Sequence, residues 1–168
     1  MGRMRMGPLG DPSYLREYEW DETGRTAISL IIVSFNNYSA TAIQFGFVEN
    51  EELVMSKTYG ESYGCSKRVI RLNHETEFVT GISGEMDNDS YISSLTFHTN
   101  LRAHQAFHLK TNVGEKACPP LKIEFHSGIL DRNEFDGFFG YYNAYRLITI
   151  NFYARHILRG VNRIKYEE

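Results

Sequence analysis

Residues 92–100 read ISSLTFHTN, a stretch in which apolar and polar side chains alternate. Leu95 and Phe97 are separated by Thr96, and His98 follows. Successive side chains of a β-strand point to opposite faces, so this alternation predicts a strand with one face toward a hydrophobic core and the other toward water. The local pattern therefore favours a sheet at this place and argues against a helix.

The same two-residue period recurs along the chain, at residues 43–47, 121–125 and 148–152. Residues 28–33 are apolar almost throughout, which fits a strand buried on both faces. Turn-forming residues interrupt these runs at short intervals, and no long amphipathic helix is visible before residue 155. About ten short strands in a chain of 168 residues predict one all-β domain with a closed or multi-sheet architecture.

Composition and charge exclude several classes of protein. The formal net charge of −3 argues against a general nucleic-acid binder, which needs a concentrated cationic face. No apolar stretch approaches the roughly 18 residues of a membrane-spanning helix, so we expect no membrane partner. The basic start of the chain lacks the apolar segment of a secretory signal, which indicates a cytoplasmic protein. In that compartment Cys65 and Cys118 are expected to be free thiols.

Motifs for common catalytic chemistry are missing from the sequence. It has no glycine-rich phosphate loop with a lysine, no nucleophile elbow and no zinc-protease helix. His104 and His108 have the spacing of two ligands on one helix face, but the surrounding pattern indicates a strand or a loop. Asp87 and Asp89 allow a catalytic pair or a polar hairpin turn, and the turn is favoured because Asp is a standard turn residue. We predict no catalytic residue, no bound metal, no cofactor and no enzyme activity.

Residues 155–168 have a different pattern. Ile157, Val161 and Ile164 lie at helical spacing among basic residues, while Gly160 weakens a helix. Chain ends are loose unless something ties them down, so a frayed, solvated tail is favoured over a docking helix.

Several motifs, taken in order, resemble those of the jacalin-related lectins. Residues 77–85, EFVTGISGE, resemble a family strand that ends in a turn of small residues and glycine, and residues 92–100 resemble the strand that follows it. Four shorter elements resemble the family's GPWG, WD, GFHG and IGVY motifs: GPLG at 7–10, Trp20 with Asp21, GFFG at 137–140 and INFY at 150–153. The resemblance covers residues 7–156, and the order and separation of the motifs make it specific.

The resemblance implies a fold and an activity. The family fold is a β-prism of three four-stranded antiparallel sheets, in which the first and last strands are adjacent. We accordingly expect a leader at residues 1–6, a jacalin-type lectin domain at 7–156 and a tail at 157–168. Family members bind carbohydrates, here expected to be mannose- or glucose-type glycans, at one end of the prism without metal or catalysis. They are commonly dimers or tetramers, so a homo-oligomer is expected as well.

By the same resemblance, the sugar-binding residues are expected in an N-terminal loop, a neighbouring hairpin and the last long loop. The candidates are Gly10; Asp87, Asn88 and Asp89; and Gly140, Tyr141, Tyr142, Asn143, Ala144 and Tyr145. Glycine lets backbone amides approach a sugar, polar side chains bind its hydroxyls, and an aromatic ring covers its apolar face. For the tyrosines, loop packing or protein contact is an equal alternative. For the hairpin, a solvated turn is favoured.

The last loop departs from the family pattern at its acidic residue. It is one residue longer than the usual GxxxD form, and Leu147 or Ile148 stands where the sugar-accepting Asp is normally found. Asn143 is the candidate replacement, while residues 11–13, DPS, replace a glycine-rich stretch. Loss of a charged acceptor removes about 1.5–3 kcal/mol of binding free energy, or one to two decades of affinity.

Two functions therefore stay open. One is a lectin domain with a degenerate sugar site that acts in plant defence or stress response. The other is a jacalin-fold protein–protein interaction module that has lost sugar binding, such as an antiviral or defence factor, because some plant members with a similarly long last loop restrict viruses.

Overall fold

The computed structural model describes residues 2–13, 18–110 and 119–155. Within these ranges the chain forms thirteen β-strands and no helix, and hence no helix long and apolar enough to cross a membrane. The two-residue period thus predicted the all-β class correctly. Cys65 is a free thiol, whereas Cys118 and the expected tail at residues 157–168 lie outside the described residues.

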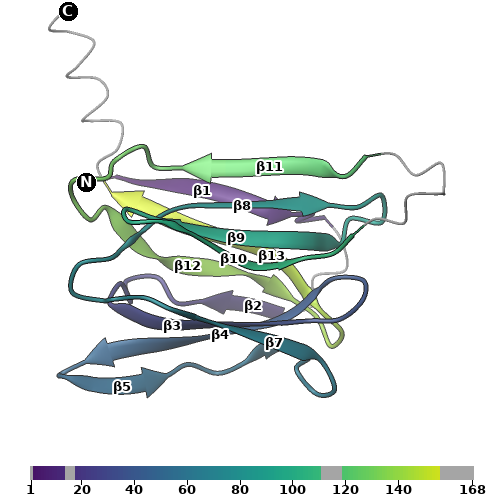
Figure 1. Ribbon diagram of the computed structural model, residues 1–168, viewed down its shortest axis with the longest axis horizontal. Helices are drawn as coiled ribbons and strands as arrows, with labels where there is room; N and C mark the ends of the chain where they lie inside the picture. Colours follow the sequence, from purple (N-terminus) through teal and green to yellow (C-terminus); the bar gives the residue numbers. More distant parts are fainter. Residues whose placement is uncertain (1, 14–17, 111–118, 156–168) are drawn as a thin grey trace, which may run out of the picture.

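The strands form three antiparallel sheets (Figure 1). The first sheet has the order β1 (Arg3–Gly10), β13 (Leu147–Arg155), β12 (Phe135–Tyr142) and β2 (Tyr18–Asp21). The second has the order β10 (Ala103–His108), β9 (Ile92–Thr99), β8 (Val79–Met86) and β11 (Leu121–His126). The third has the order β5 (Glu52–Met55), β4 (Ala40–Glu49), β3 (Ile28–Phe35) and β7 (Ser66–Arg71), with β6 (Tyr59–Gly60) paired to β4.

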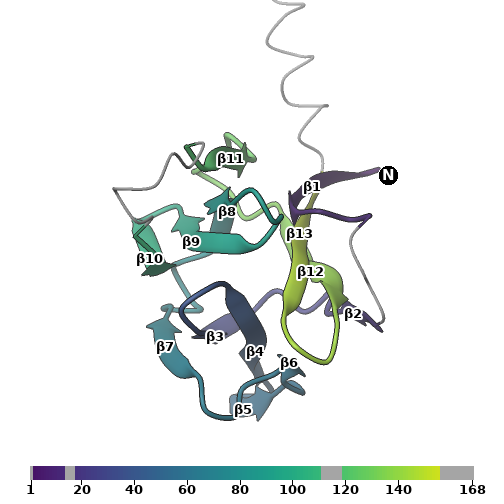
Figure 2. The ribbon, with the colours of Figure 1, turned by 90° about the vertical axis from the view of Figure 1, so that its right-hand side faces the viewer.

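Figure 2 shows the three sheets as the sides of a prism around a common core. This arrangement is the predicted β-prism. Two of the sheets have the expected four strands. The third has five, because the two-residue strand β6 pairs with Ala42 and Ile43 of β4.

The first and last described strands lie side by side. Strand β1 pairs with β13 from Arg3 opposite Arg155 to Gly10 opposite Thr149. Strand β1 therefore begins inside residues 1–6, which the sequence suggested as a leader. The domain boundaries themselves stay predictions.

Aromatic rings from all three sheets meet in the core. Phe138 of β12 stacks on Phe45 of β4, with ring centroids 5.2 Å apart, and meets Phe97 of β9 edge-on at 5.6 Å. Trp20 of β2 packs on the same Phe45 at 5.7 Å. The core therefore lies on the prism axis, where each sheet contributes its apolar face.

Burial corrects two of the expected strand faces. Thr149 and Asn151 of β13 were expected to face water, but both are fully buried. Strand β1 pairs with this stretch in the same sheet, and its Arg5 guanidinium donates to the side-chain oxygen of Asn151 at 3.3 Å. Conversely, strand β3 is not buried on both faces, because Leu30 and Ile32 are only half-buried on its outer side. Neighbouring strands and sheets, rather than the local pattern, determine the solvent exposure of each outer face.

Candidate functional site

Loops from separate parts of the chain meet at one end of the prism, at the right in Figure 1 and facing the viewer in Figure 2. Gly10 leads into the N-terminal loop with a φ of 108°, and a side chain there would collide with the backbone oxygen of Ile148. The hydroxyl and the N–H of Ser13 donate to the Asp11 carboxylate at 2.7 and 2.9 Å, which lowers the pKa of Asp11. The Ser90 hydroxyl donates to the same carboxylate at 3.3 Å, so this loop contacts the β8–β9 hairpin.

The β8–β9 hairpin is built around Asp87. One carboxylate oxygen of Asp87 accepts the N–H groups of Asp89 and Tyr91, both at 2.9 Å. Asn88 and Asp89 are exposed at the tip, and Ser90 has a φ of 66°. Asp87 thus stabilises the turn, as the favoured alternative for this segment predicted, while Asn88 and Asp89 face solvent.

The last loop is a tight turn between β12 and β13. The side-chain oxygen of Asn143 accepts the N–H groups of Tyr145 and Arg146, at 2.8 and 2.9 Å, and the N–H of Asn143 donates to the carbonyl of Arg146 at 3.0 Å. An amide oxygen has two lone pairs, so both are used inside the turn. Asn143 is 4% exposed. The structure therefore places this candidate acceptor under the loop and leaves Ala144 and Tyr145 exposed above it.

Apolar side chains stand at positions 147 and 148, where the resemblance to the family leads us to expect its acidic residue. Tyr142 pairs with Leu147 and Tyr141 pairs with Thr149, so Ile148 lies in a bulge of β13. Leu147 is 1% and Ile148 is 3% exposed. Neither side chain can accept a hydrogen bond, and Leu147 packs in the hydrophobic core.

The other last-loop candidates have different surroundings. Tyr142 packs against the rings of Tyr18 and Tyr59, with centroids 5.2 and 5.8 Å apart, so for this residue the loop-packing alternative describes the geometry. Gly140 lies against the indole of Trp20, where a side chain would not fit. Tyr141 is half-buried, and Thr149 accepts its N–H at 3.1 Å.

The loop end holds a pocket of about 260 Å³ that the sequence did not indicate. The Arg146 guanidinium lies over the Tyr91 ring, 3.7 Å from its centroid, and so joins the last loop to the β8–β9 hairpin. Tyr145 and the β3–β4 turn, which contains Tyr38, complete the pocket. Its lining residues are Asn36, Tyr38, Ser39, Tyr91, Tyr145 and Arg146.

Of the pocket residues, only Tyr145 was among the sequence candidates. Asn36 was recognisable as a turn residue, and its side-chain oxygen accepts the N–H groups of Tyr38 and Ser39 at 2.8 and 2.9 Å. No local signal placed that turn beside the last loop. Its position there depends on how the third sheet packs against the first and second.

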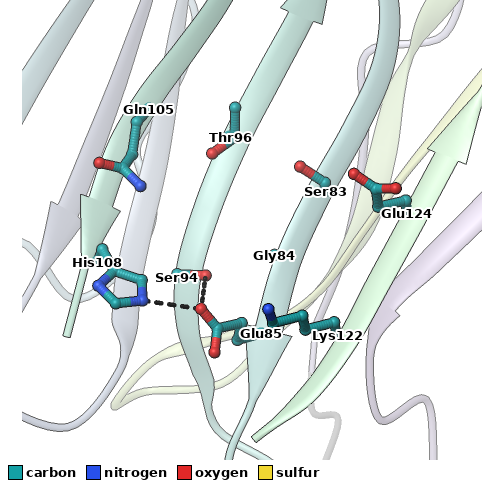
Figure 3. A pocket seen from close by; sticks show the side chains of 9 residues that line it. All are labelled: Ser83, Gly84, Glu85, Ser94, Thr96, Gln105, His108, Lys122 and Glu124. Carbon is teal, nitrogen blue, oxygen red and sulfur yellow. Dashed lines mark hydrogen bonds and ion pairs between the residues drawn. The ribbon is translucent and has the colours of Figure 1, made fainter. Parts of the chain in front are cut away.

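A second hollow, of about 430 Å³, lies on the outer face of the second sheet (Figure 3). Glu85 occupies one side of it and accepts hydrogen bonds from His108 at 2.8 Å and Ser94 at 3.5 Å. His104 instead contacts Glu77 at 2.8 Å. A bulge in β10 separates the two histidines, so they interact with different carboxylates despite their four-residue spacing.

The family model of the jacalin-like lectin domain matches residues 6–153 of this chain. Jacalin-related lectin 24 of Arabidopsis thaliana is 40% identical over 136 residues, which cover 81% of this chain and 59% of that protein. The chain belongs to the jacalin-like lectin family. The family and its fold are those of carbohydrate-binding proteins without enzyme activity.

Other relatives of this jacalin-like lectin come from the same plant. Jacalin-related lectin 25 is 33% identical over 92% of this chain and 60% of that protein. Protein RESTRICTED TEV MOVEMENT 1 is 34% identical over 90% of this chain and 87% of that protein. The chain thus spans about three fifths of the length of jacalin-related lectins 24 and 25.

Solved structures confirm the fold of this jacalin-like lectin. Single-chain recombinant jacalin has a TM-score of 0.68 and 19% identity, with 92% of this chain and 95% of that chain covered. Calsepa lectin, solved in complex with a bisected glycan, has a TM-score of 0.66 and 24% identity, with 93% and 99% covered.

Proposed function

We propose that this jacalin-like lectin domain binds mannose- or glucose-type glycans in the pocket at its loop end, in the cytoplasm of a plant cell and as part of a defence or stress response. One observation carries the proposal: the last loop, the β8–β9 hairpin and the β3–β4 turn converge on one pocket. The N-terminal loop reaches the same hairpin through Asp11 and Ser90.

The chemistry of the pocket suits a sugar. Tyr145 is 77% and Tyr38 is 70% exposed, so their rings offer flat apolar surfaces to the C–H face of a pyranose. Arg146, which is 8% exposed, brings its guanidinium to the same pocket, where it lies over the Tyr91 ring. Sugar hydroxyls need such fixed polar groups close to an apolar surface.

We expect the affinity of a single site to be low. Leu147 and Ile148 remove the charged acceptor, which is worth about 1.5–3 kcal/mol. Millimolar binding corresponds to only about −4 kcal/mol. Pairing of sites in a homo-oligomer raises the effective affinity by about 10²–10⁴, so oligomerisation is part of the proposal.

The test is calorimetry with mannose oligomers, guided by a glycan array. Tyr145→Ala and Tyr38→Ala should each weaken binding by about fivefold or more, because each removes a stacking surface. Leu130→Ala is the control, since Leu130 is 60% exposed in the connection between β11 and β12, which Figure 1 shows at the opposite end of the prism. Binding that survives both tyrosine substitutions would place the sugar elsewhere.

A protein–protein interaction module is the second candidate, and a specific surface favours it. Leu53 is 54% and Met55 is 40% exposed on the outer side of the third sheet. Both lie around Gly46 together with Leu30, within 3.1 Å of where a Cβ atom on Gly46 would be. The similarity to Protein RESTRICTED TEV MOVEMENT 1 supports the same alternative. If no mannose oligomer binds at tens of millimolar, this becomes the better account of the chain.

A further inference from the structure

A His–Gly–His row crosses three adjacent strands of the second sheet. His98 of β9 pairs with Gly81 of β8, and Gly81 pairs in turn with His126 of β11. Neighbouring strands lie about 4.8 Å apart, so two side chains that flank a middle strand are normally kept apart by the residue between them. Gly81 has no side chain, and the two imidazole rings meet above it with centroids 4.6 Å apart. A Cβ atom on residue 81 would lie 2.5 Å from Nδ1 of His126.

A carboxylate completes this group. Glu124 precedes His126 by two residues on β11, so both side chains point to the same outer face of the sheet. Oε1 of Glu124 lies 3.9 Å from Nε2 of His126. His98, Glu124 and His126 each offer one ligand atom, and these three atoms lie within 4.8 Å of one another.

Ser83 supports the same group from the middle strand. Its hydroxyl oxygen lies 2.7 Å from Nε2 of His98 and so orients that ring. Ser83 pairs with Glu124 across β8 and β11, and Figure 3 shows the two side chains next to each other at one end of the outer hollow. Histidine ligands of metals in proteins typically have such a hydrogen-bonded partner on one ring nitrogen.

We propose that His98, Glu124 and His126 form a binding site for a divalent transition-metal ion of the zinc type. Two imidazoles and one carboxylate are a donor set that zinc takes in proteins, with bonds of about 2.0–2.2 Å and a fourth position left to water. Tetrahedral geometry then puts ligand atoms about 3.4 Å apart. The side chains of Glu124 and His126 are 65% and 43% exposed, so they have room for the small closure that this requires.

The donor set also selects against other ions. Calcium takes six to eight oxygen ligands, and magnesium prefers an octahedral oxygen shell. The group here has one carboxylate and two nitrogen donors, which suit zinc and its neighbours in the transition series. The site is distinct from the loop-end pocket, with which it shares no residue.

The test uses the full chain, made without a histidine tag and stripped of metal. Calorimetry measures the binding of zinc, and the absorption of bound Co²⁺ measures the binding of that ion at the same site. One ion per chain should bind. His98→Gln and His126→Gln should each weaken binding more than about tenfold, because residues that merely support a ligand already change metal affinity about 10–100-fold. Ser83→Ala should weaken zinc binding by about tenfold, because the Ser83 hydroxyl supports the His98 ring.

His108→Gln is the matched control. His108 stands on the same outer face and contacts Glu85, but it lies outside the group of three. Its substitution should leave zinc affinity unchanged, and circular dichroism should show every variant folded. The proposal is overturned if zinc fails to bind at 1 mM, or if affinity survives His98→Gln and His126→Gln undiminished.

Discussion

At the scale of single residues, polar side chains of the same type have different tasks at the loop end. Asn143 and Asn36 each accept two backbone N–H groups in a turn. Asn143 is buried and Asn36 is exposed. A buried N–H group that loses its partner cannot be satisfied by water, so the same bonds are worth more at Asn143.

Asn143→Ala should therefore lower the free energy of unfolding by about 1–3 kcal/mol. For a domain of this size, that corresponds to a fall in Tm of roughly 2–10 °C. Asn36→Ala removes the same type of bonds at an exposed side chain, where water can replace the bond to Tyr38, and it should cost less than about 1 kcal/mol. Thermal unfolding followed by circular dichroism measures both. An equal or larger loss for Asn36→Ala would contradict the assigned role of burial.

At the scale of elements, Glu77 joins three of them before β8 begins. Its carboxylate contacts His104 of β10 at 2.8 Å, accepts the Thr99 hydroxyl at 2.7 Å at the end of β9, and accepts the Asn73 N–H at 3.1 Å after β7. Burial raises the pKa of Glu77, but the hydrogen bonds from His104, Thr99 and Asn73 outweigh it and hold the pKa below its ordinary value of 4.5. The ionised form thus stabilises the junction between the third and second sheets.

This assignment predicts a pH dependence. Because folding lowers the pKa of Glu77, its contribution to stability is present above the unfolded value of 4.5 and is lost as the pH falls through the lower folded value. Urea unfolding between pH 6 and pH 3 should therefore show a smaller loss of stability for Glu77→Gln than for the original chain. Glu75→Gln, at a side chain that is 78% exposed, is the control and should leave the slope unchanged. Equal slopes for all three chains would refute the assignment.

At the scale of the whole molecule, Phe138 holds the prism together. It is 1% exposed and contacts Phe45 of the third sheet and Phe97 of the second. The adjacent ring, Phe139, is half-buried on the outer side of the first sheet and stacks on Tyr153 at 4.3 Å. Two neighbouring phenylalanines thus differ in whether they contact one sheet or three.

Phe138→Ala should destabilise the domain by about 3–5 kcal/mol, because it opens a cavity where three sheets meet. Phe139→Ala should cost less than half as much, since its ring is half-buried within one sheet. Urea unfolding followed by the fluorescence of Trp20, the single tryptophan, reports both. Comparable losses for the two variants would show that the prism axis is not the centre of the core.

Much of the fold was readable from local pattern. Alternation at residues 92–100 and 148–152 predicted strands, because a period of two is a property of neighbouring residues in one chain segment. The resemblance to the jacalin-related lectins indicated the prism and the three loops. Local pattern misjudged the outer faces, since the burial of Thr149 and Asn151 depends on β1, which comes from the other end of the chain.

The candidate site was only partly predictable for the same reason. The sequence by itself determined that the last loop lacks a carboxylate at Leu147 and Ile148, because that is a matter of residue type. Only the tertiary structure decided that Arg146 lies on Tyr91, that Asn143 is used inside its turn, and that His98 and His126 meet above Gly81. Contacts between residues distant in the chain depend on strand register and sheet packing, which no local window of sequence contains.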